Sequence, residues 1–97
     1  MRKYKLSGLS ITDIKGIYRY TQTQFGTDQA VHYHASFKGL FARIGDNPLI
    51  GRMRPEIDDQ TRSFVHQSHI VYYEIQDNFV LILRILHGRQ DPLRHLP

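Results

Sequence analysis

Residues 61–87 read TRSFVHQSHIVYYEIQDNFVLILRILH, and this stretch decides the fold. It contains three runs rich in β-branched and aromatic residues, which favour strands. The predicted strands are Thr61–His66, His69–Ile75 and Phe79–His87. The breaks between them, Gln67-Ser68 and Gln76-Asp77-Asn78, are polar and have the length that joins antiparallel neighbours. The sequence therefore predicts a three-stranded antiparallel meander.

Two amphipathic helices are predicted upstream of the meander. The first begins at Ser10-Ile-Thr-Asp13, which has the form of a capping box. Its apolar stripe consists of Ile11, Ile14, Ile17 or Tyr18, Thr21 and Phe25. Gly26 is expected to end this helix in a left-handed turn.

The second helix is expected to start at Thr27 as its N-cap, with Asp28 in the first turn. Asn47-Pro48 ends it, because a residue before proline is pushed out of helical geometry. Its apolar stripe consists of Ala30, Tyr33, Phe37, Leu40 or Phe41, and Ile44. Two helices joined by so short a turn must lie antiparallel.

The remaining segments complete the element order. Lys3–Ser7 is a short first strand, in which Tyr4 and Leu6 alternate with lysines. Leu49–Asp59 is predicted to be a loop, and Gly88–Pro97 is a polar tail. A strand, a helical hairpin, a loop and a meander predict one α+β domain over residues 1–97, with the helices on one face of a mainly antiparallel sheet.

The last predicted strand is apolar on both faces, which is typical of a central strand. Strict alternation divides it into Val80, Ile82 and Leu86 against Phe79, Leu81, Leu83 and Ile85. The helical hairpin covers one of these faces, and a chain of 97 residues has little left for the other. We therefore expect the second face to be an interaction surface. The alternative is that the loop 49–59 and the tail fold over it.

The composition restricts chemistry and compartment. The chain has no cysteine, which excludes disulfides, thiolate metal sites and cysteine nucleophiles. It has no apolar run of membrane-spanning length and no signal peptide, so we expect a soluble intracellular protein. The net charge of +4 arises in residues 1–50, where seven Lys or Arg face three Asp. This surplus suits an acidic protein or a nucleic acid, although an ordinary soluble surface looks the same.

Four short motifs, taken in order, carry a resemblance to a known family. They are Tyr20-Thr21 with Phe25-Gly26, Asn47-Pro48 ahead of Gly51, Ser68-His69-x-x-Tyr72-Tyr73, and Arg84-Ile-Leu-His87-x-x-x-Asp91. Together they span nearly the whole chain. In these motifs the sequence resembles the ParE-type toxins of the ParE/RelE superfamily.

The resemblance implies a cytoplasmic toxin that is encoded beside an antitoxin and neutralised by it in a hetero-oligomer. The antitoxin is expected to be acidic and partly disordered until it wraps the toxin. DNA gyrase is the implied target, inhibited by protein binding so that replication stops. No cofactor, no membrane and no sequence-specific DNA binding by the toxin itself are implied. The alternatives are a RelE-like ribosome-dependent mRNA endonuclease and a non-toxic interaction module.

The candidate partner contacts are Arg62, Tyr72, Arg84, His87, Arg89, Asp91 and Leu96. A nuclease would need cations and a titratable imidazole, for which Arg62, Arg84, His87 and Arg89 are the candidates. No aromatic residue follows Phe79 to stack on a nucleotide. Arg84 needs an acidic partner inside the sheet, and we expect Glu74 on the neighbouring strand; an acid of the antitoxin is the alternative.

The histidines do not predict a metal site. His32 and His34 are two apart on a helix and diverge. His66 and His69 flank a turn and are able to approach each other, but they lack a third ligand nearby in sequence. Tyr72 and Tyr73 point to opposite faces of their strand, so one is expected in the core and the other on a partner-binding surface.

Overall fold

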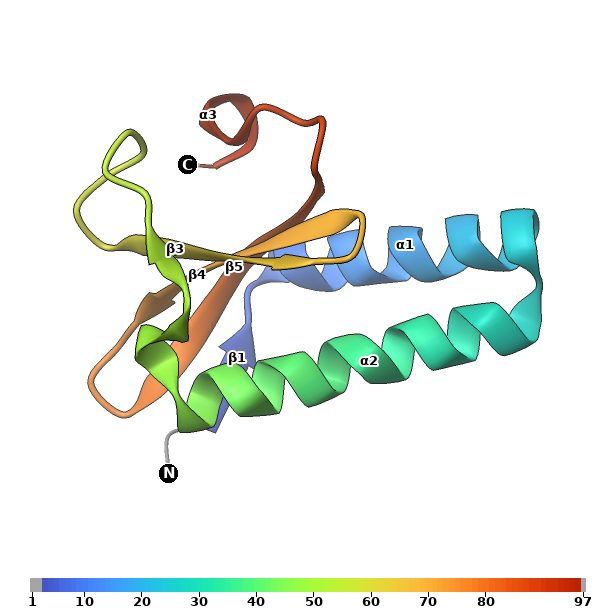
Figure 1. Ribbon diagram of the computed structural model, residues 1–97, viewed down its shortest axis with the longest axis horizontal. Helices are drawn as coiled ribbons and strands as arrows, with labels where there is room; N and C mark the ends of the chain where they lie inside the picture. The colour runs from blue at the N-terminus through green and yellow to red at the C-terminus, as the bar shows by residue number, and fades with distance from the viewer. Residues whose placement is uncertain (1–2, 97) are drawn as a thin grey trace.

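The sheet has five strands in the order β1-β5-β4-β3-β2. The computed structural model describes residues 3–96 and is shown in Figure 1. β1 (Lys3–Leu6) runs parallel to β5 (Phe79–His87), which lies centrally as predicted. β4 (His69–Ile75), β3 (Thr61–His66) and β2 (Arg52–Met53) follow as antiparallel neighbours. The predicted meander and the α+β class are confirmed.

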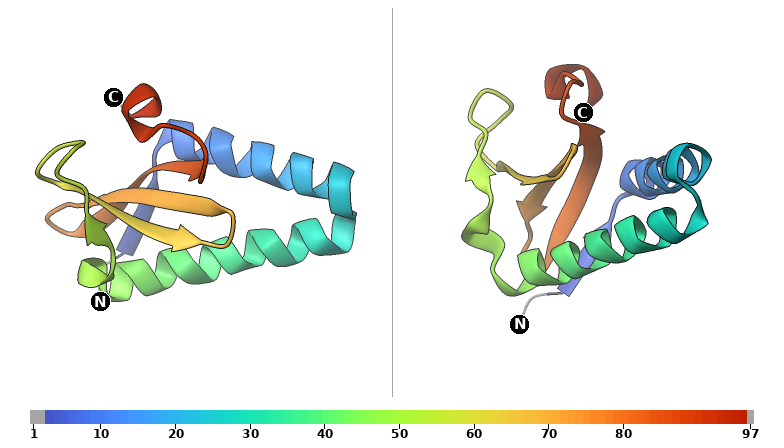
Figure 2. Two further views of the ribbon diagram at one scale, coloured as in Figure 1. Left: turned by 45° about the horizontal axis from the view of Figure 1, so that its top comes forward. Right: turned by 45° about the vertical axis from the view of Figure 1, so that its right-hand side comes forward.

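The helices α1 (Gly8–Phe25) and α2 (Thr27–Asp46) form the predicted antiparallel hairpin. They lie on one side of the sheet, and the end of the hairpin around Gly26 extends beyond it (Figures 1 and 2). Gly26 is the single residue between them, with a φ of 94°, a left-handed value that favours glycine. None of the helices described in residues 3–96 has both the length and the apolar character needed to cross a bilayer.

Both predicted N-caps are wrong by a few residues. Ser7 caps α1, because its side-chain oxygen accepts the N–H of Ser10 at 3.0 Å. The Ser7 hydroxyl also donates to the Leu83 carbonyl at 2.7 Å, so the cap joins α1 to β5. Gly26 takes the N-cap position of α2, and Thr27 is its first helical residue. The hydrogen bond from Ser7 to Leu83 joins residues that are far apart in the sequence, so the local pattern could not show it.

The segment predicted as the loop Leu49–Asp59 contains further structure. Pro48–Ile50 forms the 3₁₀ helix η1, and β2 adds a two-residue edge strand to the sheet. Tyr73 holds the segment between η1 and β2 in place. Its hydroxyl accepts a hydrogen bond from the Gly51 N–H at 2.8 Å and donates one to the Pro48 carbonyl at 2.7 Å. A Cβ at Gly51 would lie 2.7 Å from a ring carbon of Tyr73, so only glycine fits there.

The core lies between the helical hairpin and the sheet. The stripe of α2 is buried as predicted, with Phe37, Leu40, Phe41 and Ile44 packed together. On α1 the stripe is only partly correct, because Ile14 and Thr21 are buried whereas Phe25 is 69% exposed. Phe25 is the last residue of α1, at the end of the hairpin that extends past the sheet.

A β-bulge changes which residues of β5 face the helices. Tyr73 pairs with Ile82 and Tyr72 pairs with Arg84, so Leu83 has no partner in β4. The extra residue reverses the alternation beyond it. Ile85 therefore joins Val80 and Ile82 in the core, against the predicted division of the strand. Leu86 and Arg84 turn to the other face.

The predicted exposed apolar face of the meander is also wrong, and the alternative is correct. Every residue of β5 except His87 is buried or half-buried. Tyr72 and Leu86 are each 1% exposed. The β2–β3 loop places the Arg54 guanidinium 5.5 Å from the Tyr72 ring centroid, and the tail accepts a hydrogen bond from Arg84 at the His95 carbonyl. Loop and tail thus cover this face, with the tail forming the short helix α3 (Pro92–His95) seen in Figure 2.

Candidate functional site

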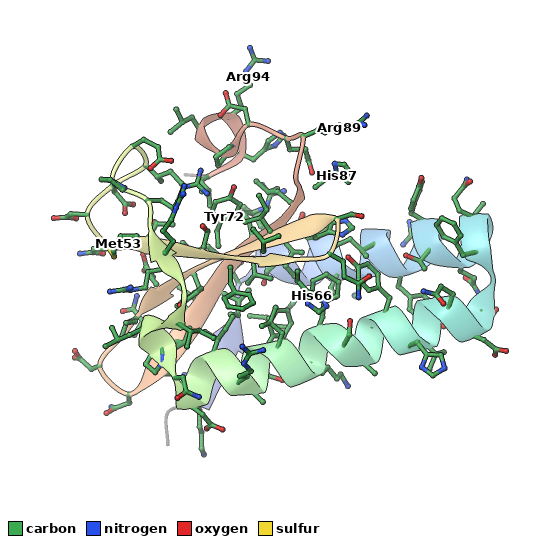
Figure 3. All side chains as sticks on the ribbon, viewed as in Figure 1. Met53, His66, Tyr72, His87, Arg89 and Arg94 are labelled. Carbon is green, nitrogen blue, oxygen red and sulfur yellow. The ribbon has the colours of Figure 1, made fainter. Side chains whose placement is uncertain are left out.

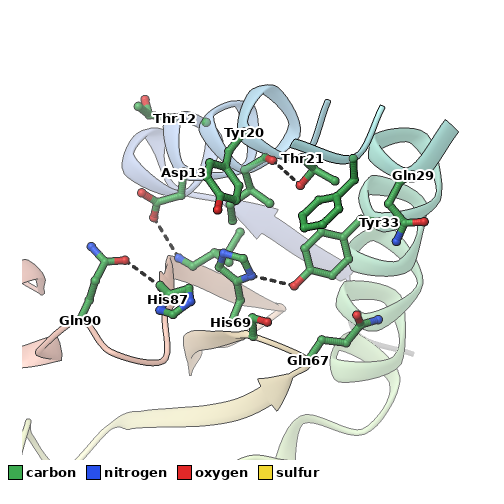
Figure 4. Close-up of a pocket in the computed structure, with 15 residues that line it drawn as sticks. Thr12, Asp13, Tyr20, Thr21, Gln29, Tyr33, Gln67, His69, His87 and Gln90 are labelled. Carbon is green, nitrogen blue, oxygen red and sulfur yellow. Dashed lines mark hydrogen bonds between the residues drawn. The ribbon is translucent and has the colours of Figure 1, made fainter. Parts of the chain in front are cut away.

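A groove of about 680 Å³ lies between the helical hairpin and one end of the sheet. α1 and α2 form one wall, and the opposite wall comes from the β3–β4 turn and the end of β5 (Figure 4). The hairpin projects beyond the sheet here, so no further element of the described chain fills the space. The residues used below are Asp13, Gly16, Tyr20, Phe25, Tyr33, His69 and His87.

The α1 wall is apolar, aromatic and open. Tyr20 is 63% exposed and Phe25 is 69% exposed, both unusually high for aromatic side chains on a helix that also serves the core. Gly16 lies between them and the helix start, and a Cβ there would meet no atom within 4 Å. Exposed aromatic side chains around a groove mark a binding surface.

The floor of the groove is built from histidines and a tyrosine. His66 pairs with His69 between β3 and β4, and His69 pairs with His87 between β4 and β5. Tyr33 of α2 lies over this row, with its hydroxyl 2.7 Å from His69 Nδ1. The Ser36 hydroxyl lies 2.8 Å from His66 Nε2, and His66 points between the sheet and α2 (Figure 3). His66 and His69 thus approach each other as anticipated, yet no three potential metal ligands cluster anywhere in residues 3–96.

Burial lowers the pKa of two of these imidazoles, those of His66 and His69. The pKa of His69 falls from its ordinary 6.5 to about 4, mainly through burial and further through repulsion from His87 and His66. Burial also lowers the pKa of His66. Burial raises the pKa of Tyr33, and a backbone hydrogen bond from Ser68 opposes that rise. The His69 and His66 rings are therefore neutral and polar at pH 7.

We expect acid to destabilise the protein through His69. Its pKa is lower in the folded than in the unfolded state, so the unfolded state binds the proton first and stability falls as pH drops from 6.5 towards 4. The loss in the free energy of unfolding should be about 1–3 kcal/mol. Urea titrations at pH 7.5 and 4.5 measure it. His69→Gln should have a flatter pH profile than the wild type, and equal slopes would contradict the assignment.

Asp13 closes the groove at its β5 side. Its carboxylate accepts Arg84 Nε at 2.8 Å and Arg84 Nη2 at 2.9 Å, and it also accepts the Ile85 N–H at 2.9 Å. Both side chains of this ion pair are mostly buried, with 12% and 15% exposure. Arg84 is thus paired inside the chain as predicted, but the expected partner Glu74 is wrong. The bulge places Arg84 on the face away from the helices, and from there its guanidinium reaches both Asp13 of α1 and the His95 carbonyl of the tail. The 71 residues between Arg84 and Asp13 hid this pair from the sequence.

The residues predicted as contacts divide into three groups. His87, Arg89 and Asp91 are exposed beyond the bulge of β5, with Arg89 pointing away from the protein (Figure 3). Arg84 and Arg62 are engaged, the latter with the Gly51 carbonyl at 2.9 Å. The remaining calls fall on structural positions: Tyr72 is buried and Leu96 is the C-cap of α3.

Sequence reasoning missed the groove itself. The local pattern places Asp13 in a capping box, and Tyr20 contributes only to a family motif. A signal was available in α1, because Tyr20 is apolar yet lies off the stripe formed by Ile14, Ile17 and Thr21. Gly16 in a helix interior is a second signal, since glycine there costs about 1 kcal/mol relative to alanine.

Comparison with known proteins agrees with these features. Residues 4–92 match the family described as the ParE toxin of the type II toxin–antitoxin system, parDE. The chain is 27% identical over 96 residues to Toxin ParE1 of Caulobacter vibrioides, covering 99% of each chain. It is 30% identical over 95 residues to Toxin ParE1 of Mycobacterium tuberculosis, covering 97% of each.

A solved structure shares the fold. The structure described as the chromosomal ParDE TA system from P. aeruginosa superposes with a TM-score of 0.78, at 17% identity, over 90% of this chain and 96% of that one. The family match extends from β1 to the start of α3, so it includes the whole helical hairpin, the sheet and the groove between them. The chain therefore belongs to the ParE toxin family of type II toxin–antitoxin systems.

Proposed function

We propose that this toxin is held inactive by an antitoxin segment bound in the groove, and that its target is DNA gyrase. The observation that supports the first part is the groove, which combines open aromatic side chains with a neutral polar floor. The second part follows from the family resemblance. Inhibition would occur by protein binding, and the protein would act in the cytoplasm, where gyrase and its DNA are found.

The shape of the groove suits a helical or extended peptide. Gly16 leaves the α1 backbone accessible, and Tyr20 and Phe25 provide apolar area next to it. An antitoxin segment that is disordered alone would gain this burial on binding and lose ordering entropy at the same time. Of the candidate contacts, His87 lines the groove itself. Arg89 and Asp91 follow it on the adjacent turn and are available to the same partner.

The buried members of the candidate set have a supporting role in this proposal. Arg84 and Arg62 hold the tail and the η1 segment, and Tyr72 lies under Arg54. They would influence a partner by shaping the surface rather than by touching it. Leu96, at the end of α3, lies on the side of the sheet away from the helices.

A gyrase assay tests the target. Purified protein is added to gyrase, ATP and supercoiled plasmid, and the DNA is analysed after detergent and protease treatment. We expect linear DNA to accumulate with toxin concentration and to disappear when the antitoxin is added in equimolar amount. Omission of gyrase is the control for a contaminating nuclease.

A parallel assay with translating ribosomes separates the alternatives. Message cut in the ribosomal A site, with gyrase unaffected, would replace the gyrase proposal with a RelE-like activity. Inactivity in both assays, together with normal antitoxin binding, would indicate a non-toxic interaction module. In each case antitoxin binding is measured separately by isothermal titration calorimetry, so the two parts of the proposal stand or fall independently.

A further inference from the structure

His69 and His87 lie side by side on the floor of the groove (Figure 4). They are register partners on β4 and β5, and their ring centroids are 5.6 Å apart. His87 is exposed, whereas His69 is half-buried beneath Tyr33. His69 also packs edge-on against the buried Phe37 ring, with the ring centroids 5.9 Å apart.

The Nδ1 atoms of both rings are already occupied. The Arg89 backbone N–H donates to His87 Nδ1 at 3.2 Å. The Tyr33 hydroxyl lies 2.7 Å from His69 Nδ1 and also donates to the His66 carbonyl at 3.4 Å. A neutral imidazole has one donor and one acceptor nitrogen. Because His87 Nδ1 accepts, the neutral His87 ring carries its proton on Nε2, and the Nε2 atoms of both rings remain for a ligand.

We propose that His69 and His87 together bind one carboxylate of the antitoxin segment in the groove. This inference rests on the proposed function and adds the chemistry by which the groove recognises its partner. A carboxylate accepts charge-assisted hydrogen bonds of about 2.7–2.9 Å at each of its two oxygens. That reach is sufficient for two rings at the separation seen here.

The charges around the groove favour an acid over a base. Asp13 is the one carboxylate lining the groove in the described chain, and Arg84 and the Ile85 N–H engage both of its oxygens. The other titratable groups that face the pair are His66 from β3, Tyr33 from α2 and Tyr20 from α1. Arg89, two residues after His87, points away from the protein and does not line the groove. An incoming carboxylate therefore meets the His87 Nε2–H and no free acid.

A carboxylate and an apolar side chain bound at His69 and His87 would give opposite pH dependences of the antitoxin affinity. A carboxylate beside the imidazoles favours their charged form, so the complex takes up a proton and affinity rises as pH falls. An apolar side chain in the same place disfavours the charged form, so affinity falls as pH drops. One proton taken up gives at most about a tenfold change in affinity per pH unit.

The test is calorimetric titration of the full-length protein with its antitoxin at pH 8 and pH 6. We expect binding to be about three- to tenfold tighter at pH 6, with proton uptake visible as a dependence on buffer ionisation enthalpy. His87→Gln, at an exposed position that does not endanger folding, should lose most of this gain. His32→Gln, exposed on α2 and away from the groove, is the matched control and should keep it.

A scan of the antitoxin identifies the carboxylate. Each Asp or Glu is changed to Asn or Gln, and one change should abolish the pH dependence and add nothing to the effect of His87→Gln. Affinity that is constant or lower at pH 6, with a stable complex, overturns the carboxylate site and leaves the groove proposal intact. Absence of any complex at either pH rejects both.

Discussion

Gly16→Trp should abolish neutralisation by the antitoxin while leaving the toxin folded and active. The indole would fill the groove from the middle of α1, where nothing of the chain lies within 4 Å of the added Cβ. Blocking a central contact of an interface costs roughly 3 kcal/mol, which is a loss of affinity of about a hundredfold. The helix itself should tolerate the change, because glycine is among the poorest residues in a helix interior. Cells that produce the variant should die even with antitoxin present.

Gly39→Trp provides the matched control for this prediction. Gly39 is also an exposed glycine in a helix interior with no atom near its Cβ, but it lies on α2 and does not line the groove. Its antitoxin affinity should equal that of the wild type. Calorimetric titration and a plasmid-loss assay measure binding and toxicity. Normal binding by Gly16→Trp would show that the antitoxin docks elsewhere.

Asp13→Ala should lower the free energy of unfolding by about 3–5 kcal/mol. The change leaves the Arg84 guanidinium mostly buried without its bidentate partner, and it removes the acceptor of the Ile85 N–H as well. Such a loss is a large share of the 5–15 kcal/mol that stabilises a typical domain. The C-terminal tail should also loosen, since Arg84 holds the His95 carbonyl. Urea denaturation followed by circular dichroism gives the stability.

Two further variants show whether the unpaired charge of Arg84 causes the expected loss of stability. Asp28→Ala, in the exposed first turn of α2, removes only a helix-dipole contact and should cost less than about 1 kcal/mol. Asp13→Leu combined with Arg84→Met removes both charges and should recover much of the loss, because apolar replacement of a buried ion pair is often tolerated. A loss below 1 kcal/mol for Asp13→Ala alone would mean that Arg84 finds another partner.

The sequence by itself determined the first strand, the two long helices and the meander, in their order; it did not show η1, β2 or α3. The period of the apolar residues changes from helical to strand-like near Thr61, and polar breaks separate the strands, so the helical hairpin and the meander follow from local patterns. The stripe of α2 was predicted correctly because Phe37, Phe41 and Ile44 recur at helical spacing. The family could also be inferred, because its short motifs preserve their order along the chain.

The tertiary structure alone decided the faces and the site. Leu83 looks like any other apolar residue of its strand, yet its place in a bulge turns Ile85 to the core and Arg84 to the opposite face, from which Arg84 reaches Asp13 and the tail. The tail and the β2–β3 loop cover a face that alternation had left open, because contacts such as Arg54 with Tyr72 join distant segments.

The groove likewise exists only because a long hairpin overhangs one end of a short sheet. Local periodicity indicates which residues prefer burial, but it does not indicate which segment packs against them. A cavity forms where no segment packs, so it depends on the relative placement of all the elements. That placement is set by long-range packing, which no stretch of the sequence contains on its own.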